Sequence, residues 1–148
     1  MITLELAELL DRTGLSVLDH LEKQVLVPVI DGLQAQGDLI VIPFALLGPV
    51  HLMWRADWDE VPPEGVELIR AAAGNNPHTL VADPRTCRWT TDFHDPLGLG
   101  IAVFHNTAPA YLVHPEHGGT GIAPGTWLVR RQQERGTTPR TRSLLVVD

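Results

Sequence analysis

The chain has few of the residues that carry out most covalent chemistry. Cys87 is its one cysteine, which excludes an intrachain disulfide and a zinc site built from cysteines. Lys23 is the only lysine among 11 Lys and Arg residues. Because it lies in the expected N-terminal helical region, the lysine-containing phosphate loop of P-loop proteins is excluded. We expect Cys87 to be a small buried hydrophobic side chain rather than a reactive thiol.

Serine is also scarce, since Ser16 and Ser143 are the only two in the chain. A Gly-x-Ser-x-Gly nucleophile motif therefore cannot form, and the His-Glu-x-x-His motif of zinc enzymes is missing too. Residues 98–100 and 118–121 are glycine-rich, but neither segment follows a strand and opens a helix. We expect both to be turns rather than dinucleotide-binding loops.

Long apolar runs and an excess of positive charge are lacking as well. No apolar run reaches the ~18 residues that a membrane helix needs, and the first residues have neither the basic region nor the cleavage site of a signal peptide. The net charge of -7 argues against nucleic acid as a partner, because phosphate binding depends on Lys and Arg. We therefore expect a cytoplasmic protein that contacts neither membranes nor nucleic acids.

What is present is the composition of one globular domain, with 148 residues of which 44% are hydrophobic. Residues 1–35 show apolar positions at helical spacing, first over residues 3–10 and again from Ser16. Pro28 interrupts the second segment, and whether that helix resumes over residues 29–36 stays open. We expect this N-terminal helical segment to pack on the rest of the chain or on a dimer partner.

Short β-rich runs separated by turn residues follow from Gly37 onward, and turn signals recur every ~8–12 residues. Residues 66–73 contain several alanines and are compatible with a helix or a strand, of which we favour the strand. The sequence thus predicts a mainly β fold, α+β overall. One or two N-terminal helices precede a small antiparallel barrel or sandwich over residues 36–134, and a flexible tail follows over residues 135–148. The expected strands are residues 38–43, 51–55, 66–73, 78–82, 87–91, 100–105, 110–114 and 126–132.

The densest group of potential metal ligands lies at a proline corner, where His114, Glu116 and His117 occur within four residues. On an extended strand His114 and Glu116 share one face and His117 points to the other. These three side chains therefore cannot bind one ion unless Pro115 bends the chain. A further ligand must come from elsewhere, and His78 is the best candidate. The candidate ligands of a divalent ion such as zinc are His78, His114, Glu116 and His117.

The same corner has a purely structural interpretation. Its side chains then satisfy amides and carbonyls of the turn, and Glu116 accepts hydrogen bonds from Arg130 or Arg131 across a hairpin. In the metal interpretation, His105 is the second candidate for the distant ligand. The two interpretations differ in whether the imidazole nitrogens bind the protein itself or an ion.

Three segments carry a recurring pattern: Gln36-Gly-Asp-Leu-Ile40, His114-Pro-Glu-His-Gly118 and Ile122-Ala-Pro-Gly-Thr-Trp-Leu-Val-Arg-Arg-Gln-Gln-Glu134. Together they resemble a group of small bacterial proteins of uncharacterised function. Those proteins share a Gln-Gly-Asp strand, a His-x-Glu-His-Gly corner and a Pro-Gly-x-aromatic-x-Val-x-x-Gln-x-Glu ending. The resemblance implies a β-rich fold over residues 36–134. The group's central His-x-His segment keeps at most one histidine here, His78.

Two functions from different classes fit these observations. The first is a non-catalytic β-module, an accessory or protein-interaction protein that needs no cofactor and contacts a protein partner or a second copy of itself. The alternative is a small metal-dependent enzyme or metal-binding protein that uses the histidine and glutamate group. We favour the first. Trp54 and Trp58, expected in a loop, are the tryptophans to test for contact with a ligand or partner.

Overall fold

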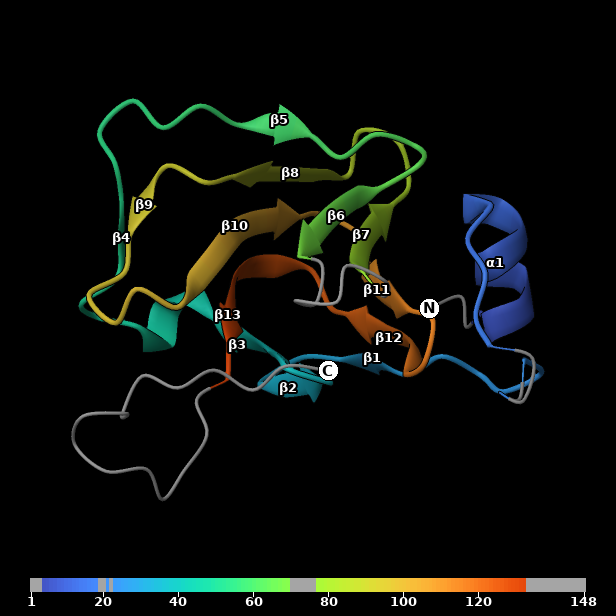
Figure 1. The fold of residues 1–148 in the computed structure, drawn as a ribbon. Coiled ribbons are helices and arrows are strands. Elements are labelled where there is room, and N and C mark those ends of the chain that lie inside the picture. Colours follow the sequence, from blue (N-terminus) through green and yellow to red (C-terminus); the bar gives the residue numbers. More distant parts are fainter. Residues whose placement is uncertain (1–3, 19–20, 22, 70–76, 133–148) are drawn as a thin grey trace, which may run out of the picture.

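The computed structural model describes residues 4–18, 21, 23–69 and 77–132, and Figure 1 shows the course of the chain. The tail predicted over residues 135–148 and residues 70–73 of the ambiguous segment lie outside the described residues. None of the helices in the described part is long and apolar enough to cross a membrane.

The elements are α1 (Leu6–Thr13), β1 (Val29–Ile30), β2 (Gln34–Gln36), β3 (Leu39–Pro43), the short 3₁₀ helix η1 (Phe44–Leu46), β4 (His51–Leu52), β5 (Asp59–Glu60), β6 (Val66–Ile69), β7 (His78–Ala82), β8 (Cys87–Thr90), β9 (Phe93–His94), β10 (Gly100–Asn106), β11 (Ala110–His114), β12 (Gly118–Ile122) and β13 (Gly125–Arg131).

The described strands form two large sheets and one small one (Figure 1). The five-stranded sheet has the order β1-β12-β11-β7-β6, the six-stranded sheet has the order β2-β3-β13-β10-β8-β5, and β4 pairs with β9. These pairs are antiparallel except that of β1 with β12. Because each large sheet has two edge strands, the mainly β prediction is confirmed in the form of a sandwich and not of a closed barrel.

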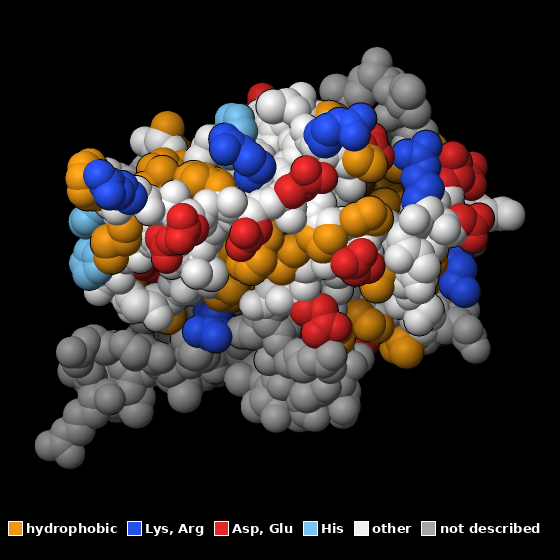
Figure 2. All heavy atoms as spheres, turned by 90° about the horizontal axis from the view of Figure 1, so that it is seen from above, with side chains coloured by type: hydrophobic (Ala, Val, Ile, Leu, Met, Phe, Trp, Pro, Cys, Tyr) orange, Lys and Arg blue, Asp and Glu red, His pale blue; other side chains and the backbone are white. Residues whose placement is uncertain are grey.

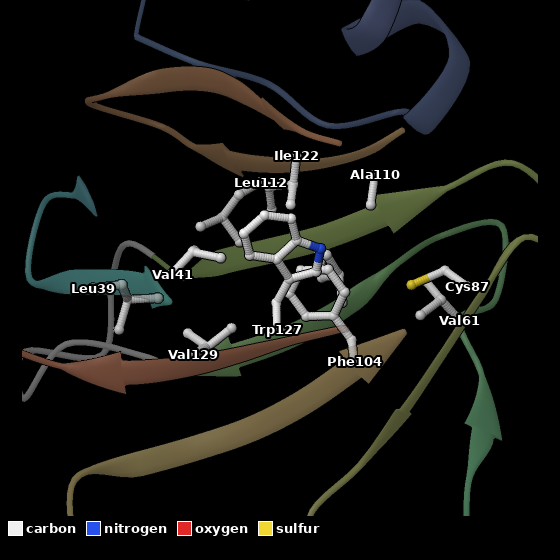
Figure 3. Packing of buried hydrophobic residues seen from close by; sticks show 11 residues of the cluster. Leu39, Val41, Val61, Cys87, Phe104, Ala110, Leu112, Ile122, Trp127 and Val129 are labelled. Carbon is white, nitrogen blue, oxygen red and sulfur yellow. The ribbon is translucent and has the colours of Figure 1, made fainter. Parts of the chain in front are cut away.

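The main hydrophobic core fills the space between the two large sheets (Figure 3). Trp127 and Phe104 from the six-stranded sheet meet Leu112 and Ile122 from the five-stranded sheet. Side chains alternate across a strand, so Leu128, next to Trp127, faces the other side and belongs to a separate buried cluster. Both faces of the central strands β10 and β13 are therefore in apolar surroundings.

Helix α1 covers the outer face of the five-stranded sheet. Leu6, Leu9 and Leu10 recur at helical spacing and are buried against the outward side chains of β7 and β11. The helix ends at Gly14, whose left-handed backbone (φ 72°) lets its N–H donate to the carbonyl of Leu10. The first of the two expected helices is therefore confirmed, within residues 6–13.

The second helix, expected from Ser16, is wrong, because the described residues between 14 and 28 contain no helix. Leu26, which the helical pattern places on a buried stripe, is 60% exposed. This segment runs beside α1 instead, where the carbonyls of Lys23 and Val25 accept hydrogen bonds from the first N–H groups of the helix. The chain then enters β1 and β2, so residues 29–36 do not resume a helix. Pro28, which has no N–H to donate, favours this extended course.

The turn expected at residues 118–121 is also wrong, since these residues belong to β12. A Cβ atom at Gly121 would lie 2.8 Å from the carbonyl oxygen of Pro28, and one at Gly119 would lie 3.1 Å from a methyl carbon of Leu9. Glycine is therefore used in this strand because other parts of the chain approach it closely.

The remaining strand predictions agree with the structure. β7 and β11 have the predicted bounds, β3, β8 and β10 differ from them by one residue at one end, and β13 is shifted by one residue at both ends. The ambiguous segment is a strand over Val66–Ile69, and the strand predicted at 51–55 is shortened to β4. The loop predicted around Phe93 contributes β9, which pairs with β4.

Candidate functional site

His78 and His114 lie side by side at one end of the sandwich. His78 begins β7 and His114 ends β11, and these two strands are antiparallel neighbours. Alternation along each strand gives them the same inward face as Leu80 and Leu112, which belong to the core between the sheets. The two imidazole centroids are 4.3 Å apart, and the residues are only 1% and 0% exposed.

Gln36 and Asp38 reach the same place from the opposite sheet. They flank Gly37, which has a left-handed backbone (φ 56°) at the turn between β2 and β3, and both are buried. The Oε1 atom of Gln36 lies 2.9 Å from His78 Nδ1, and the Oδ1 atom of Asp38 lies 2.9 Å from His78 Nε2. Both ring nitrogens of His78 are therefore hydrogen-bonded to the other sheet.

The amide of Gln36 is oriented by a second contact between the sheets. Its Nε2 atom donates to the carbonyl of Leu112 at 2.9 Å. A carbonyl oxygen only accepts, so the NH₂ group must face Leu112 and Oε1 must face His78. Gln34, two residues earlier on β2, likewise donates from Nε2 to the carbonyl of Gly121 at 3.0 Å. Side-chain hydrogen bonds from β2 thus hold the two sheets together.

These contacts determine where the protons of His78 lie. The Oε1 atom of Gln36 is an acceptor, so His78 Nδ1 carries a hydrogen. The Asp38 carboxylate is an acceptor as well, and the short bond from Nε2 to Oδ1 therefore contains a second proton. With a carboxylate oxygen and an amide oxygen as the two acceptors, we assign both hydrogens to the ring, so that His78 is an imidazolium paired with the Asp38 carboxylate.

Gln132, the residue after β13, holds the turn that carries Asp38. Its Nε2 atom donates to the carbonyl of Gly37 at 3.0 Å, and its backbone N–H donates to the carbonyl of Asp38 at 2.9 Å. The end of the β13 segment therefore fixes the backbone on which Gln36 and Asp38 are mounted. The Gln-Gly-Asp segment and the C-terminal motif segment thus form one structural unit.

His114 takes part in a turn of its own. The backbone N–H groups of Glu116 and His117 donate to His114 Nδ1 at 3.0 and 3.3 Å. Nδ1 is therefore the unprotonated nitrogen, and Nε2 carries the hydrogen of a neutral imidazole. His117 is exposed, and its ring centroid lies 4.5 Å from that of His114 and 6.4 Å from that of His78. We call this group the polar cluster: Gln36, Asp38, His78, His114 and His117.

Three of the four predicted metal ligands, His78, His114 and His117, have their rings close together. Glu116 is exposed, and its backbone N–H donates to His114 Nδ1. A metal ion needs an unprotonated nitrogen, whereas both nitrogens of His78 and Nδ1 of His114 already bond to the protein. Within residues 4–18, 21, 23–69 and 77–132, no group of three or more His, Cys, Asp or Glu side chains is placed to hold a metal ion. The metal site stays a prediction.

Two other residues named by the sequence pattern have different partners. His105 is on β10, in the other sheet, and its Nδ1 atom lies 2.8 Å from the hydroxyl of Thr126. Arg130 pairs with Asp95, through bonds of 3.0 and 2.6 Å. These hydrogen bonds hold the pKa of Asp95 below its ordinary value. The structural interpretation of the corner is therefore wrong in pairing Arg130 with Glu116.

Sequence reasoning missed Gln36, Asp38 and Gln132 as site residues. A signal was present, since all three belong to the motif segments that carry the resemblance described above. Polar side chains beside the apolar run of β3 have to find hydrogen-bond partners once they are buried. Which partners they find depends on the packing of the sheets, because 42 positions separate Gln36 from His78.

Two single residues are where the sequence predicts. Cys87 is buried in the main core, and burial raises the pKa of its thiol to about 12. It is therefore protonated near neutral pH and is a poor nucleophile. Trp54, expected in a loop, is 84% exposed. Trp58, by contrast, is partly buried and packs on the cluster around Leu128.

The comparisons with known proteins identify one family that covers most of the described chain. A family model described as a domain of unknown function, DUF8820, matches residues 35–132. The matched segment includes the whole polar cluster and Gln132, and excludes α1. No curated protein and no solved structure matches the chain.

The hydrogen bonds of His78 lead to a testable prediction for its protonation. We expect long-range ¹⁵N–¹H NMR at pH 7 to find hydrogens on both ring nitrogens in the native protein. In Asp38→Asn, the new NH₂ group can donate to Nε2, so His78 becomes neutral and keeps a hydrogen on Nδ1 alone. A single protonated nitrogen in the native protein, or an unchanged pattern in Asp38→Asn, would contradict the assignment.

Proposed function

The chain belongs to the DUF8820 family of domains of unknown function, and from this premise we propose that it is a non-catalytic β-module that binds a protein partner. The polar cluster supports this proposal because its acid–base groups bond to one another. A general base must reach the proton that it removes from a substrate, and His78 is buried with both nitrogens occupied. The polar cluster therefore fits a role in stabilising the fold. We place the binding of a protein partner on the exposed surface of the domain.

The observation that carries the proposal is the exposure of Trp54. A tryptophan buries a large apolar area when it enters an interface, and Trp and Arg are the residues most often found at the energetic centre of protein interfaces. Here Trp54 is 84% exposed, and the guanidinium carbon of Arg55 lies 4.4 Å from the centroid of its ring. Met53, the preceding residue, is exposed as well. We call these three residues, Met53, Trp54 and Arg55, the Trp54 surface.

The Trp54 surface lies at the end of the molecule that carries β4 and β9. Hydrophobic, Arg and His side chains gather at this end (Figure 2). Met53, Trp54 and Arg55 directly follow β4. A contact made here leaves both the polar cluster and the main core undisturbed.

Trp54 is presented on a turn that is held in place by Asp92. The Met53 N–H donates to the carbonyl of Asp92 at 2.9 Å, and the Asp57 N–H donates to its carboxylate at 2.8 Å. Between them, Arg55 has a left-handed backbone (φ 61°), which costs about 1–2 kcal/mol for a residue with a Cβ atom. A fixed turn that exposes Trp54 loses little conformational entropy when a partner binds.

The chemistry of this surface indicates the kind of partner it fits. An apolar recess can accept the indole ring of Trp54, and a carboxylate at the rim of the recess can pair with Arg55. The whole chain is acidic, with a net charge of -7, so Arg55 is a local positive charge that can pair with a carboxylate at short range. A second copy of the chain is one form of such a partner, because it carries many carboxylates.

We predict that Trp54→Ala abolishes partner binding without changing stability. The native protein is expressed in its source cells with a photo-crosslinking amino acid at Met53, and adducts are identified by mass spectrometry. Loss of a tryptophan at the centre of an interface costs roughly 2 kcal/mol or more of binding free energy. The crosslinking yield of Trp54→Ala should therefore be at least about tenfold lower than that of the native protein. Sedimentation of the purified protein then shows whether the adduct is a second copy of the chain.

The matched control is Leu33→Ala, which removes another exposed hydrophobic side chain, 61% exposed in the connection between β1 and β2. Its adducts should equal those of the native protein. Undiminished adducts in Trp54→Ala, or an equal loss in Leu33→Ala, would contradict binding through the Trp54 surface.

The convergence of three imidazoles favours a second candidate function, a metal-dependent protein that uses His78, His114, Glu116 and His117. It requires His78 and His114 to release their present hydrogen bonds, and it makes His117 a ligand. The β-module proposal predicts that His117→Ala does not change the zinc content of the untagged protein, measured by elemental analysis after zinc-replete expression. Stoichiometric zinc that is lost in His117→Ala would establish the second candidate instead.

A further inference from the structure

The small β4–β9 sheet carries two histidines directly opposite each other. His51 on β4 and His94 on β9 are Cα partners in the antiparallel register. Their ring centroids are 5.4 Å apart with an angle of 49° between the ring planes, and both residues are exposed. From this geometry we propose that His51 and His94 form a surface site for one divalent transition-metal ion that prefers imidazole, such as Cu²⁺ or Zn²⁺.

The separation of the rings fits one ion held between them. With a metal–nitrogen distance of about 2 Å, a metal lies roughly 3 Å from the centroid of each ligating ring, so two rings on one ion have centroids about 4.5–6 Å apart. The observed 5.4 Å lies within this interval. Binding requires that one nitrogen of each ring points at a shared position between the two rings.

The chemical state of these two rings differs from that in the polar cluster. Neither His51 nor His94 has a hydrogen-bond partner in the part of the chain that the structure describes, and both rings are in contact with solvent. A neutral, exposed imidazole keeps one nitrogen lone pair available, and imidazole is a good ligand for copper, zinc and nickel. Water completes the coordination, so the ion is expected to exchange with solvent.

The backbone beneath the pair is held by the neighbouring residues. Leu52 and Phe93 form the adjacent cross-strand pair, and both pack on the buried cluster around Leu128. Because alternate residues of a strand point to opposite faces, this packing directs His51 and His94 away from the core. The Met53 N–H bond to the carbonyl of Asp92 extends the same pairing by one step. The two histidines are therefore mounted on an anchored ribbon, which lowers the entropy cost of binding one ion.

This site is independent of the Trp54 surface and of the polar cluster in its residues. It needs neither a protein partner nor any release of the hydrogen bonds of His78. The failure of one proposal therefore leaves the other standing, and variants at His51 and His94 separate them.

The test is a calorimetric titration of the full-length, untagged protein with Cu²⁺ and with Zn²⁺, after removal of metals by a chelator. We expect one Cu²⁺ per chain, and His51→Ala and His94→Ala should each weaken binding by at least the roughly tenfold that even the loss of an outer-shell partner costs. Electron paramagnetic resonance of the Cu²⁺ complex should show two imidazole nitrogens, and one in either variant.

His105→Ala and His117→Ala are the matched controls, since each removes one imidazole elsewhere and should leave Cu²⁺ affinity unchanged. Circular dichroism of all four variants checks that each remains folded. Absence of binding, equal affinity in the native protein and His51→Ala, or a loss of affinity confined to His117→Ala would overturn the site at His51 and His94.

Discussion

The hydrogen bonds that join His78 to Gln36 and Asp38 are the interaction on which the rest of this structure depends. They connect β7 of one sheet with the β2–β3 turn of the other, and Gln132 holds that turn from the end of β13. Removing one partner of a buried ion pair costs about 3–5 kcal/mol, a large part of the ~5–15 kcal/mol that stabilises an ordinary domain. The free energy that the polar cluster contributes is therefore large enough to determine whether the two sheets pack on each other.

The placement of these groups separates fold from binding. Inside the sandwich, imidazole, amide and carboxylate groups satisfy one another, which gives them a structural task. At the β4–β9 end, Trp54 and the pair His51 and His94 are exposed on backbone that is anchored by buried or hydrogen-bonded neighbours. Rigid support beneath exposed side chains is what an interaction surface requires. The proposals for partner and metal binding both follow from this second kind of placement.

The sequence predicts much of the fold and only part of the site. Short apolar runs bounded by turn residues locate β7 and β11 to the residue, because turn residues act through local backbone geometry. The errors lie where distant residues determine the local structure. β12 needs glycines because Pro28 and α1 lie against it, and the described residues between Ser16 and Pro28 run beside α1 rather than forming a helix. For the same reason the sequence names His78 and His114 as candidates for one site but cannot reveal that Gln36 and Asp38 contact His78 from the other sheet.

The most direct test of the central claim is a double-mutant cycle between Gln36 and His78, measured by urea unfolding. Gln36→Ala, His78→Ala and the double variant give the coupling free energy between the two sheets, with Leu33→Ala as a control for a surface change. We expect a coupling of about 1–3 kcal/mol, as for residues in one buried hydrogen-bond network. A coupling near zero would contradict the account, because Gln36 and His78 would then stabilise their sheets independently.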